Sequence, residues 1–169
     1  MTSIKYNHFS HISDLADTST ARGNEEILQS VLELYDHALL GQSYNSERNP
    51  HGMTAGRKQE LIKNYFRDNQ LVIASRGNMS KKALGIITFH TIETEAAWID
   101  GLAVEEAIRG ASIGRNLVER VEQHAQALHL GSVALRSAQQ AVPFYESIGF
   151  TRTNDDTQPV FVKYFDKKH

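Results

Sequence analysis

The chain has 169 residues, of which 40% are hydrophobic and 22% are charged, a composition typical of one globular domain with a sizeable core. A formal charge of −2 and a pI near 6.4 give no basic surface of the kind that nucleic-acid binding requires. The lack of cysteine excludes disulfides and a thiol nucleophile, and no apolar run reaches the length of a membrane span. We therefore expect one domain over residues 1–169, in the cytoplasm, without nucleic-acid or membrane partners.

The N-terminal third combines a weak strand pattern with two helix patterns. Residues Ser3–Phe9 alternate poorly but can form a first strand. A broad apolar stripe follows, for which Asn24 is the expected N-cap and Gly41 the expected end. The stretch 42–56 is hydrophilic, and residues 61–66 have the apolar spacing of a second, shorter helix. This part of the chain therefore predicts two helices joined by a polar linker.

The middle of the chain predicts a β-meander. Apolar runs at Leu71–Ala74 and Ala83–Phe89 lie on either side of a glycine-containing turn and predict a hairpin. Polar residues 91–95 then turn the chain into a third strand, Ala97–Val104, which is rich in bulky and β-branched residues. No internal repeat or interdomain linker interrupts this order.

The turn after Val104 has the composition of an anion-binding site. Apolar residues recur at helical spacing from Ile113, so we expect a helix to begin there. The first N–H groups of a helix lack intrahelical partners and carry partial positive charge. Gly110 lets a ligand approach the backbone, while Arg109 and Arg115 add positive charge. A phosphate or pyrophosphate is the expected ligand; the alternative is an ordinary strand-to-helix connection.

The C-terminal part predicts another strand and helix and then a final strand. Gly131 ends the long helix, Val133–Leu135 is a short buried strand, and a helical segment follows near residue 145. Val160–Phe165 is the last strand, and residues 150–153 can pair with it.

Two stretches together resemble the GNAT superfamily of N-acetyltransferases. One matches that family's acetyl-CoA pyrophosphate-loop pattern, and the other matches its second signature at the expected distance downstream. They consist of Val104, Arg109-Gly110 and Ile113-Gly114, and of Ala141, Phe144-Tyr145 and Gly149-Phe150. The resemblance implies an α/β fold with a mixed, mostly antiparallel sheet, a splayed central strand pair and helices on both faces.

The resemblance also implies an enzyme that transfers an acetyl group from acetyl-CoA to a primary amine, without a metal. Small-molecule acceptors (polyamine, aminoglycoside, amino acid) and a protein or peptide amine all stay open, as does a homodimer. One alternative is a non-catalytic module that binds acyl-CoA. A dinucleotide-binding domain would require Gly-x-Gly-x-x-Gly after a first strand, and this turn offers only Gly110 and Gly114.

The resemblance implies how CoA is held. The backbone of the strand end would bind the pantetheine arm like an added strand, and the amides from Gly110 to Gly114 would surround the pyrophosphate. Two positions depart from the family pattern: Ser112 replaces a frequent glycine, and Ala138 replaces a frequent asparagine, with Gln139 beside it. The expected cofactor-binding residues are Leu102, Ala103, Val104, Arg109, Gly110, Ala111, Ser112, Ile113, Gly114, Arg115, Gln139 and Phe144.

Tyr145 is the expected general acid. A phenol with a pKa near 10 stays protonated at neutral pH and can donate to the leaving sulfur. The resemblance implies the same role, because a tyrosine at this place in the second signature protonates the departing CoA in many members. The alternative is that Tyr145 only packs.

Asp100 is the candidate base. Strand alternation places it on one face with Trp98 and Leu102, and a carboxylate beside an apolar ring can have a raised pKa and accept a proton. The position where some relatives carry a catalytic glutamate holds Trp98, and Glu93 and Glu95 lie in the preceding turn. Asp100 as a structural hydrogen-bonding group is the alternative.

Four histidines invite a metal or catalytic interpretation. His8 and His11 have the spacing of two ligands on a helix face, but no third or fourth ligand lies near them in sequence. His124 and His129 fall on the edge and at the end of the predicted helix from Ile113, where partial burial or a favourable C-terminal charge explains them. We therefore expect no metal site.

Overall fold

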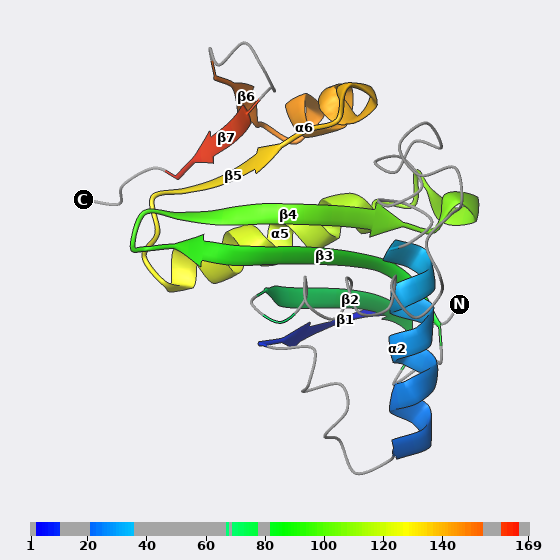
Figure 1. The fold of residues 1–169 in the computed structure, drawn as a ribbon. Coiled ribbons are helices and arrows are strands. Elements are labelled where there is room, and N and C mark those ends of the chain that lie inside the picture. Colours follow the sequence, from blue (N-terminus) through cyan, green and yellow to red (C-terminus); the bar gives the residue numbers. More distant parts are fainter. Residues whose placement is uncertain are drawn as a thin grey trace, which may run out of the picture. The chain divides into compact units, whose positions relative to one another are not determined.

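A computed structural model describes residues 3–10, 21–35, 67, 69–77, 82–153 and 160–165. The strands form a seven-stranded sheet in the order β1-β2-β3-β4-β5-β7-β6 (Figure 1). They are β1 (Ile4–Phe9), β2 (Gln70–Arg76), β3 (Ala83–Ile92), β4 (Ala96–Val104), β5 (Ser132–Arg136), β6 (Thr151–Arg152) and β7 (Val160–Tyr164). The helices are α2 (Ala21–Tyr35), α5 (Ile113–Ala127) and α6 (Val142–Ser147), with 3₁₀ turns η2 (Glu106–Ile108) and η3 (Gln139–Ala141).

The predicted mixed α/β fold is confirmed. β4 and β5 run parallel, whereas β1 with β2, β5 with β7 and β6 with β7 run antiparallel. The described residues fall into two compact units, and the boundary between them runs through β3, β4 and α5. Unit 1 comprises residues 1–88 and 101–117, and unit 2 comprises residues 89–100 and 118–169.

Three expected boundaries are wrong. The long helix ends at Ala127 and not at Gly131, and the residue with positive φ after it is His129. Asn24 is not an N-cap, because α2 begins at Ala21 and Asn24 lies inside it; the strong helix formers Ala21 and Arg22 extend the helix towards the N-terminus. β3 continues to Ile92, beyond the predicted Phe89, because β-branched residues favour the extended chain. The expected end at Gly41, the linker and the second helix lie outside the described residues.

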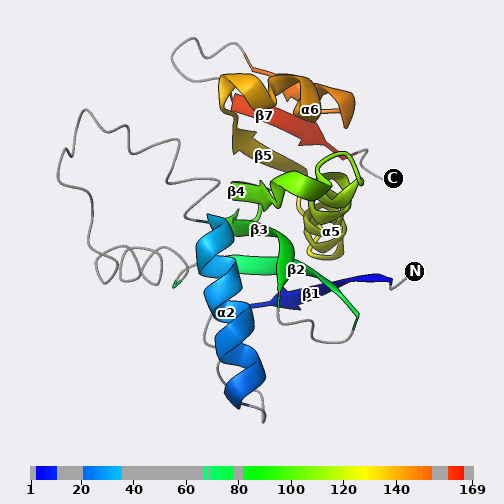
Figure 2. The same cartoon turned by 90° about the vertical axis from the view of Figure 1, so that its right-hand side faces the viewer.

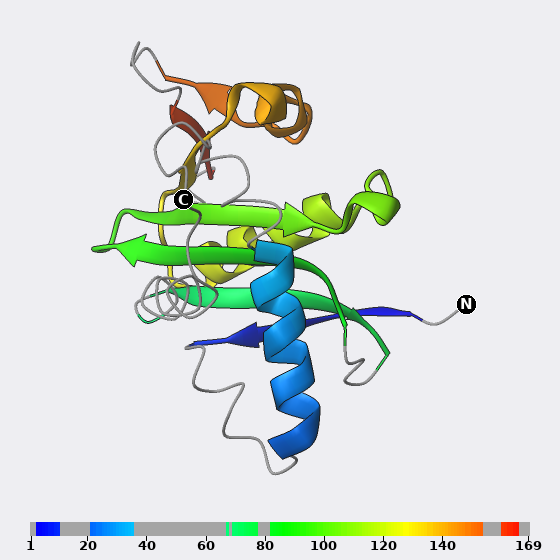
Figure 3. The same cartoon turned by 45° about the vertical axis from the view of Figure 1, so that its right-hand side comes forward.

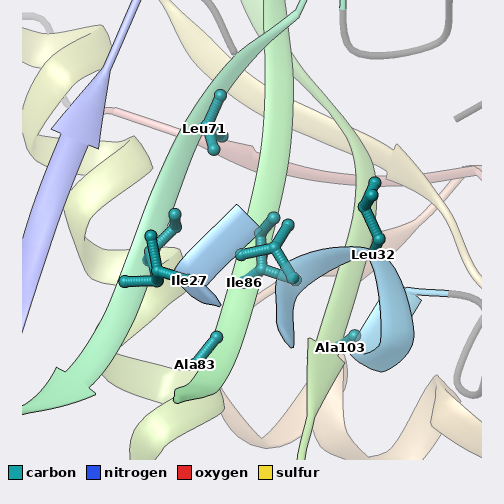
Figure 4. Close-up of a cluster of buried hydrophobic side chains, with 8 residues drawn as sticks. Ile27, Leu32, Leu71, Ala83, Ile86 and Ala103 are labelled. Carbon is teal, nitrogen blue, oxygen red and sulfur yellow. The ribbon is translucent and has the colours of Figure 1, made fainter. Parts of the chain in front are cut away.

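In unit 1, α2 packs on one face of the strands. Figure 3 shows α2 crossing β1, β2 and β3, and Figure 4 shows its Ile27 and Leu32 among residues of the strands. Ile86 points to this cluster, whereas its neighbour Gly85 faces Ile113 and Leu117 of α5. Successive strand residues point to opposite faces, so helices cover both faces of β3. The buried cluster comprises Ile27, Val31, Leu32, Leu71, Ile73, Ala83, Ile86 and Ala103.

In unit 2, a parallel ladder and an antiparallel ladder meet at β5. The first part of β4 pairs with β5 from Ala96↔Ser132 to Ile99↔Leu135, and β5 pairs with β7 from Ser132↔Tyr164 to Arg136↔Val160. Figure 2 shows α6 beside β5 and β7. Lys163 of β7 donates to both oxygens of Glu122, at 2.8 and 2.9 Å, and to the carbonyl of Ile148 at 3.0 Å. This ion pair ties β7 to α5 and to the end of α6.

Candidate active site

The connection from β4 to α5 is a tightly wound turn in unit 1. Its backbone N–H groups bond three residues back: Ile108 to Glu105 at 3.1 Å, Arg109 to Glu106 at 3.2 Å, and Ala111 to Ile108 at 3.2 Å. This 3₁₀ turn was not predicted from the sequence, because its three residues carry no periodic pattern. The wound segment leaves residues 109–112 exposed immediately before α5.

The end of this turn has the backbone conformation of an anion-binding loop. Gly110 has φ +91° and Ser112 has φ +60°, while Ala111 between them is not in the left-handed region. Left-handed residues of this kind turn backbone N–H groups toward a concavity that favours anions, while the N–H of Ala111 is bonded to the carbonyl of Ile108. No atom lies within 4 Å of the position that a Cβ of Gly110 would occupy, so the backbone is open to a ligand there.

Ser112 opens α5. Its carbonyl accepts the N–H of Asn116 at 3.0 Å, so the N–H groups of Ile113, Gly114 and Arg115 belong to the first turn and have no intrahelical acceptor. A serine at φ +60° carries strain of about 1–3 kcal/mol. This strain gives a physical reason why glycine suits the position, and the structure tolerates serine there.

Two contacts fix the turn relative to the sheet of unit 1. Ile113 is buried, and its Cγ2 lies 3.0 Å from the Cβ position of Gly85, so the missing side chain on β3 lets the first turn of α5 approach closely. Arg109 Nε donates to the carbonyl of Val104 at 3.4 Å. Arg109 and Arg115 are both exposed, as an anion ligand would require.

β4 extends beyond its ladder with β5. The four paired residues end at Ile99, and β4 continues to Val104. On its other edge, Leu84 of β3 accepts the N–H of Glu105 at 2.9 Å. Ala103 is buried, whereas Leu102 and Val104 are half-buried. The segment expected to bind pantetheine is therefore the end of β4, which lies beyond the ladder with β5 and is hydrogen-bonded on the β3 side.

In unit 2, Tyr145 lies on α6 and is only 7% exposed. Its ring meets those of Phe144 and Phe150 edge to face, with centroid distances of 5.0 and 5.8 Å. Its carbonyl accepts the N–H of Phe150 at 3.1 Å, so the chain folds back after α6. Burial raises the pKa of Tyr145 from 10.0 to about 12. Gln139 is exposed in η3, and Phe144 is half-buried.

Asp100 has a hydrogen-bonding partner that the sequence did not predict. Its Oδ2 lies 2.7 Å from Nδ1 of His90 on β3. Burial raises the pKa of Asp100 above 3.8, and the hydrogen bond and charge of His90 oppose part of that rise. The signal that could have found the pair is the hairpin itself, because residues on either side of a turn face each other. Trp98, Asp100 and Leu102 are all half-buried and alternate with buried residues, as expected for one face of β4.

The other histidines have structural surroundings. His8 Nε2 lies 2.9 Å from Gln70 Oε1, and the His124 ring meets Phe89 edge to face at 5.3 Å. His11 lies outside the described residues. Within the segments that the structure describes, no three His, Asp or Glu side chains gather as metal ligands, and no helix has both the length and the apolar character needed to cross a bilayer.

Comparison with solved structures gives the same fold. PaiA N-acetyltransferase from Thermoplasma acidophilum, in complex with coenzyme A, has a TM-score of 0.67 at 18% identity, covering 96% of this chain and 99% of that one. A GNAT family acetyltransferase from Elizabethkingia anophelis with acetyl-CoA bound has a TM-score of 0.62 at 15% identity, covering 96% and 98%. An acetyltransferase from Streptococcus agalactiae has a TM-score of 0.61 at 20% identity, covering 98% and 100%.

Comparison of sequences identifies the family. No curated protein sequence shows significant similarity to the chain. The acetyltransferase (GNAT) domain family matches residues 44–166, which is most of the chain and includes the turn before α5 and the segment of α6. The chain therefore belongs to the GNAT family of acetyltransferases and is an acyltransferase.

Proposed function

We propose that the chain transfers the acetyl group of acetyl-CoA to a primary amine by direct attack. The observation that carries the proposal is the turn before α5, where Gly110 and Ser112 have positive φ beside the first N–H groups of the helix, which have no intrahelical acceptor. This backbone suits the pyrophosphate of CoA, and family membership supports the same ligand.

The proposed donor site comprises the strand end and the turn. Leu102, Ala103 and Val104 would bind the pantetheine arm through their backbone, and the segment 109–115 would bind the pyrophosphate. Gln139 and Phe144 complete the proposed contacts. The open space around Gly110 supports this assignment, because a side chain there would occupy the ligand's place.

The proposed chemistry follows from the needs of acyl transfer. The acceptor must be a free amine, and its nitrogen bonds to the thioester carbon. The C–S bond breaks so that the sulfur leaves with the electron pair, and the nitrogen loses one proton, which ends on the sulfur. Tyr145 is the proposed donor to that sulfur, since its raised pKa keeps the hydroxyl protonated at neutral pH.

The proposed acceptor is an amine of a small molecule or of a protein. A streptothricin acetyltransferase from Bacillus anthracis in complex with acetyl-CoA is similar over 59% of this chain, with a TM-score of 0.52. At 19% identity this likeness favours no particular acceptor. A cytoplasmic location and a homodimer remain predictions, which cell fractionation and light scattering would test.

Two experiments test the proposal. Calorimetric titration should give micromolar binding of acetyl-CoA and CoA and no response to NAD; absence of CoA binding would reject the donor site. Thiol release from acetyl-CoA should then depend on an amine in a panel of spermidine, kanamycin, L-lysine and a peptide with a free N-terminus. CoA binding without transfer to any of them would instead favour a non-catalytic acyl-CoA-binding module.

A further inference from the structure

A histidine and an aspartate form a hydrogen-bonded pair across the hairpin of β3 and β4. His90 Nδ1 lies 2.7 Å from Asp100 Oδ2, and the two side chains are 39% and 18% exposed. An ionised carboxylate only accepts hydrogen bonds, so with Asp100 ionised the shared proton would belong to Nδ1. The neutral ring then has its lone pair on Nε2, the nitrogen that is not bound to Asp100.

We infer that His90 is the base that removes a proton from the acceptor amine, and that Asp100 is its positioning residue. This inference rests on the proposed acetyl transfer and changes the role that the sequence predicts for Asp100. One N–H bond of the ammonium breaks and its proton bonds to Nε2 of His90. The free amine then attacks the thioester carbon, the C–S bond breaks with its electron pair on sulfur, and the second proton of the nitrogen passes to that sulfur. His90 returns its proton to water.

The chemistry favours the ring over the carboxylate as the proton acceptor. Asp100 is the less exposed of the two, and its Oδ2 is already engaged by His90. Imidazole is the side chain that changes charge between pH 5 and 8. A carboxylate at Nδ1 fixes the tautomer and stabilises the imidazolium that forms. An alkylamine with a pKa of about 10.4 is a free base in only about one molecule in 2,500 at pH 7, so a base is useful.

The place of Asp100 on β4 supports the same role. The ladder with β5 ends at Ile99, one residue before Asp100, and the proposed pantetheine segment begins at Leu102. Asp100 therefore precedes the proposed pantetheine segment by two residues in the sequence, which makes the pair a candidate for the acceptor side of the reaction.

The charged surroundings of His90 are simple within the described residues. Asp100 is the charged group that contacts the ring, and Glu93 and Glu95 lie in the turn of the same hairpin. Burial destabilises the charged form of Asp100 and so raises its pKa. A proton on the adjacent ring therefore stabilises the paired carboxylate by neutralising its charge.

The test compares variants that keep the hydrogen bond with variants that disturb it. His90→Asn keeps an N–H donor toward Asp100 and removes the basic nitrogen, and Asp100→Asn keeps the shape and removes the charge. The matched control is His129→Asn, at an exposed position with φ +58° where asparagine is readily accommodated. Thermal melting and CoA affinity of all variants show whether each has folded.

The probes are the best alkylamine among spermidine, kanamycin and L-lysine, and hydroxylamine, which is largely unprotonated at neutral pH. His90→Asn should lower kcat/KM for the alkylamine about 100-fold or more at pH 7 and change that for hydroxylamine by less than about threefold. Both His90→Asn and Asp100→Asn should shift the acidic limb of the alkylamine pH–rate profile. Equal losses for both nucleophiles, or an unchanged limb, would overturn the inference.

A measurement without substrate completes the test. Nitrogen-15 NMR of the histidines should show His90 with its proton on Nδ1, and Asp100→Asn should change that tautomer; a wild-type proton on Nε2 would overturn the inference even if acetyl transfer is found. No transfer by the wild-type protein to any amine of the panel would reject acetyl transfer and the base together. Acetyl transfer by the wild-type protein, with the acidic limb of the pH–rate profile unaltered in His90→Asn and Asp100→Asn, would reject only the role of His90 as the base.

Discussion

The close approach of β3 to the first turn of α5 leads to a prediction about stability. A methyl group added at Gly85 would lie 3.0 Å from Ile113 Cγ2, 3.0 Å from Leu117 Cδ1 and 3.2 Å from the carbonyl oxygen of Ala103. Optimal separations between carbon atoms are about 3.5–4.0 Å. Leu117 can rotate the end of its side chain away. Ile113 cannot, because a β-branched residue in a helix has one strongly preferred rotamer.

Gly85→Ala should therefore displace the first turn of α5 and destabilise the protein. Overpacking of this kind costs about 1–3 kcal/mol, which lowers Tm by roughly 3–9 °C in a chain of this length. The matched control is Gly131→Ala, whose added methyl group would lie 3.6 Å from the carbonyl oxygen of Glu95, an ordinary contact distance. The control should leave stability unchanged or raise it by up to about 1 kcal/mol.

Thermal unfolding followed by circular dichroism measures both variants. Because Ile113 directly follows the proposed pyrophosphate turn, calorimetry should also show weaker CoA binding by Gly85→Ala than by Gly131→Ala. Equal Tm values for the two variants would refute the packing argument. A lower Tm with unchanged CoA affinity would support the packing explanation and refute its link to the donor site.

Two further changes test the turn and the ion pair. Gly110→Ala and Gly149→Ala place alanine at φ +91° and +93°, so both should lower the free energy of unfolding by about 1–2 kcal/mol. Only Gly110→Ala should weaken CoA binding in calorimetry, and a similar loss of CoA affinity in both variants would contradict the turn's role. Lys163→Met leaves the Glu122 carboxylate without its donor and should cost about 2–3 kcal/mol in urea denaturation, less than for fully buried pairs. Adding Glu122→Gln should recover most of that loss, and no recovery would refute the pairing.

Local patterns predicted the elements around the turn well. The switch from strand to helix between Val104 and Ile113 depends on periodicity within a few residues, and the structure places both ends where the pattern does. The need for a left-handed backbone at Gly110 is also a local property. The start of α2 was misplaced because Asn24 has a strong capping preference, yet Ala21 and Arg22 favour a helix and α2 continues through Gly23.

The contacts of the candidate catalytic residues depend on pairing that local patterns do not give. His90 reaches Asp100 because β3 continues to Ile92 and the turn is confined to residues 93–95, whereas the sequence suggested a turn from residue 91. Periodicity identifies strands, but the register between two strands is set by the turn and by side-chain packing. The burial of Tyr145 similarly depends on Phe150 returning to its ring.

The burial of Tyr145 restricts how it can serve the leaving group. A pKa of about 12 lies about 3.5 units above that of an ordinary cysteine-type thiol, so complete proton transfer from the phenol to a free thiolate is uphill by about 5 kcal/mol. Tyr145 is therefore better suited to donate a hydrogen bond to the developing charge on sulfur than to lose its proton. Tyr145→Phe should lower kcat about 100-fold, the typical effect of removing one such donor, with CoA affinity retained.

The pH dependence distinguishes the two roles of Tyr145. A phenol with a raised pKa stays protonated throughout the range from pH 6 to 10, so the ratio of wild-type to Tyr145→Phe rates should be constant over that range. A tyrosine with the ordinary pKa of 10.0 would be half ionised at pH 10, and the ratio would fall by about half there. A declining ratio would refute the buried hydrogen-bond donor. A ratio near one at every pH would mean that Tyr145 only packs between Phe144 and Phe150.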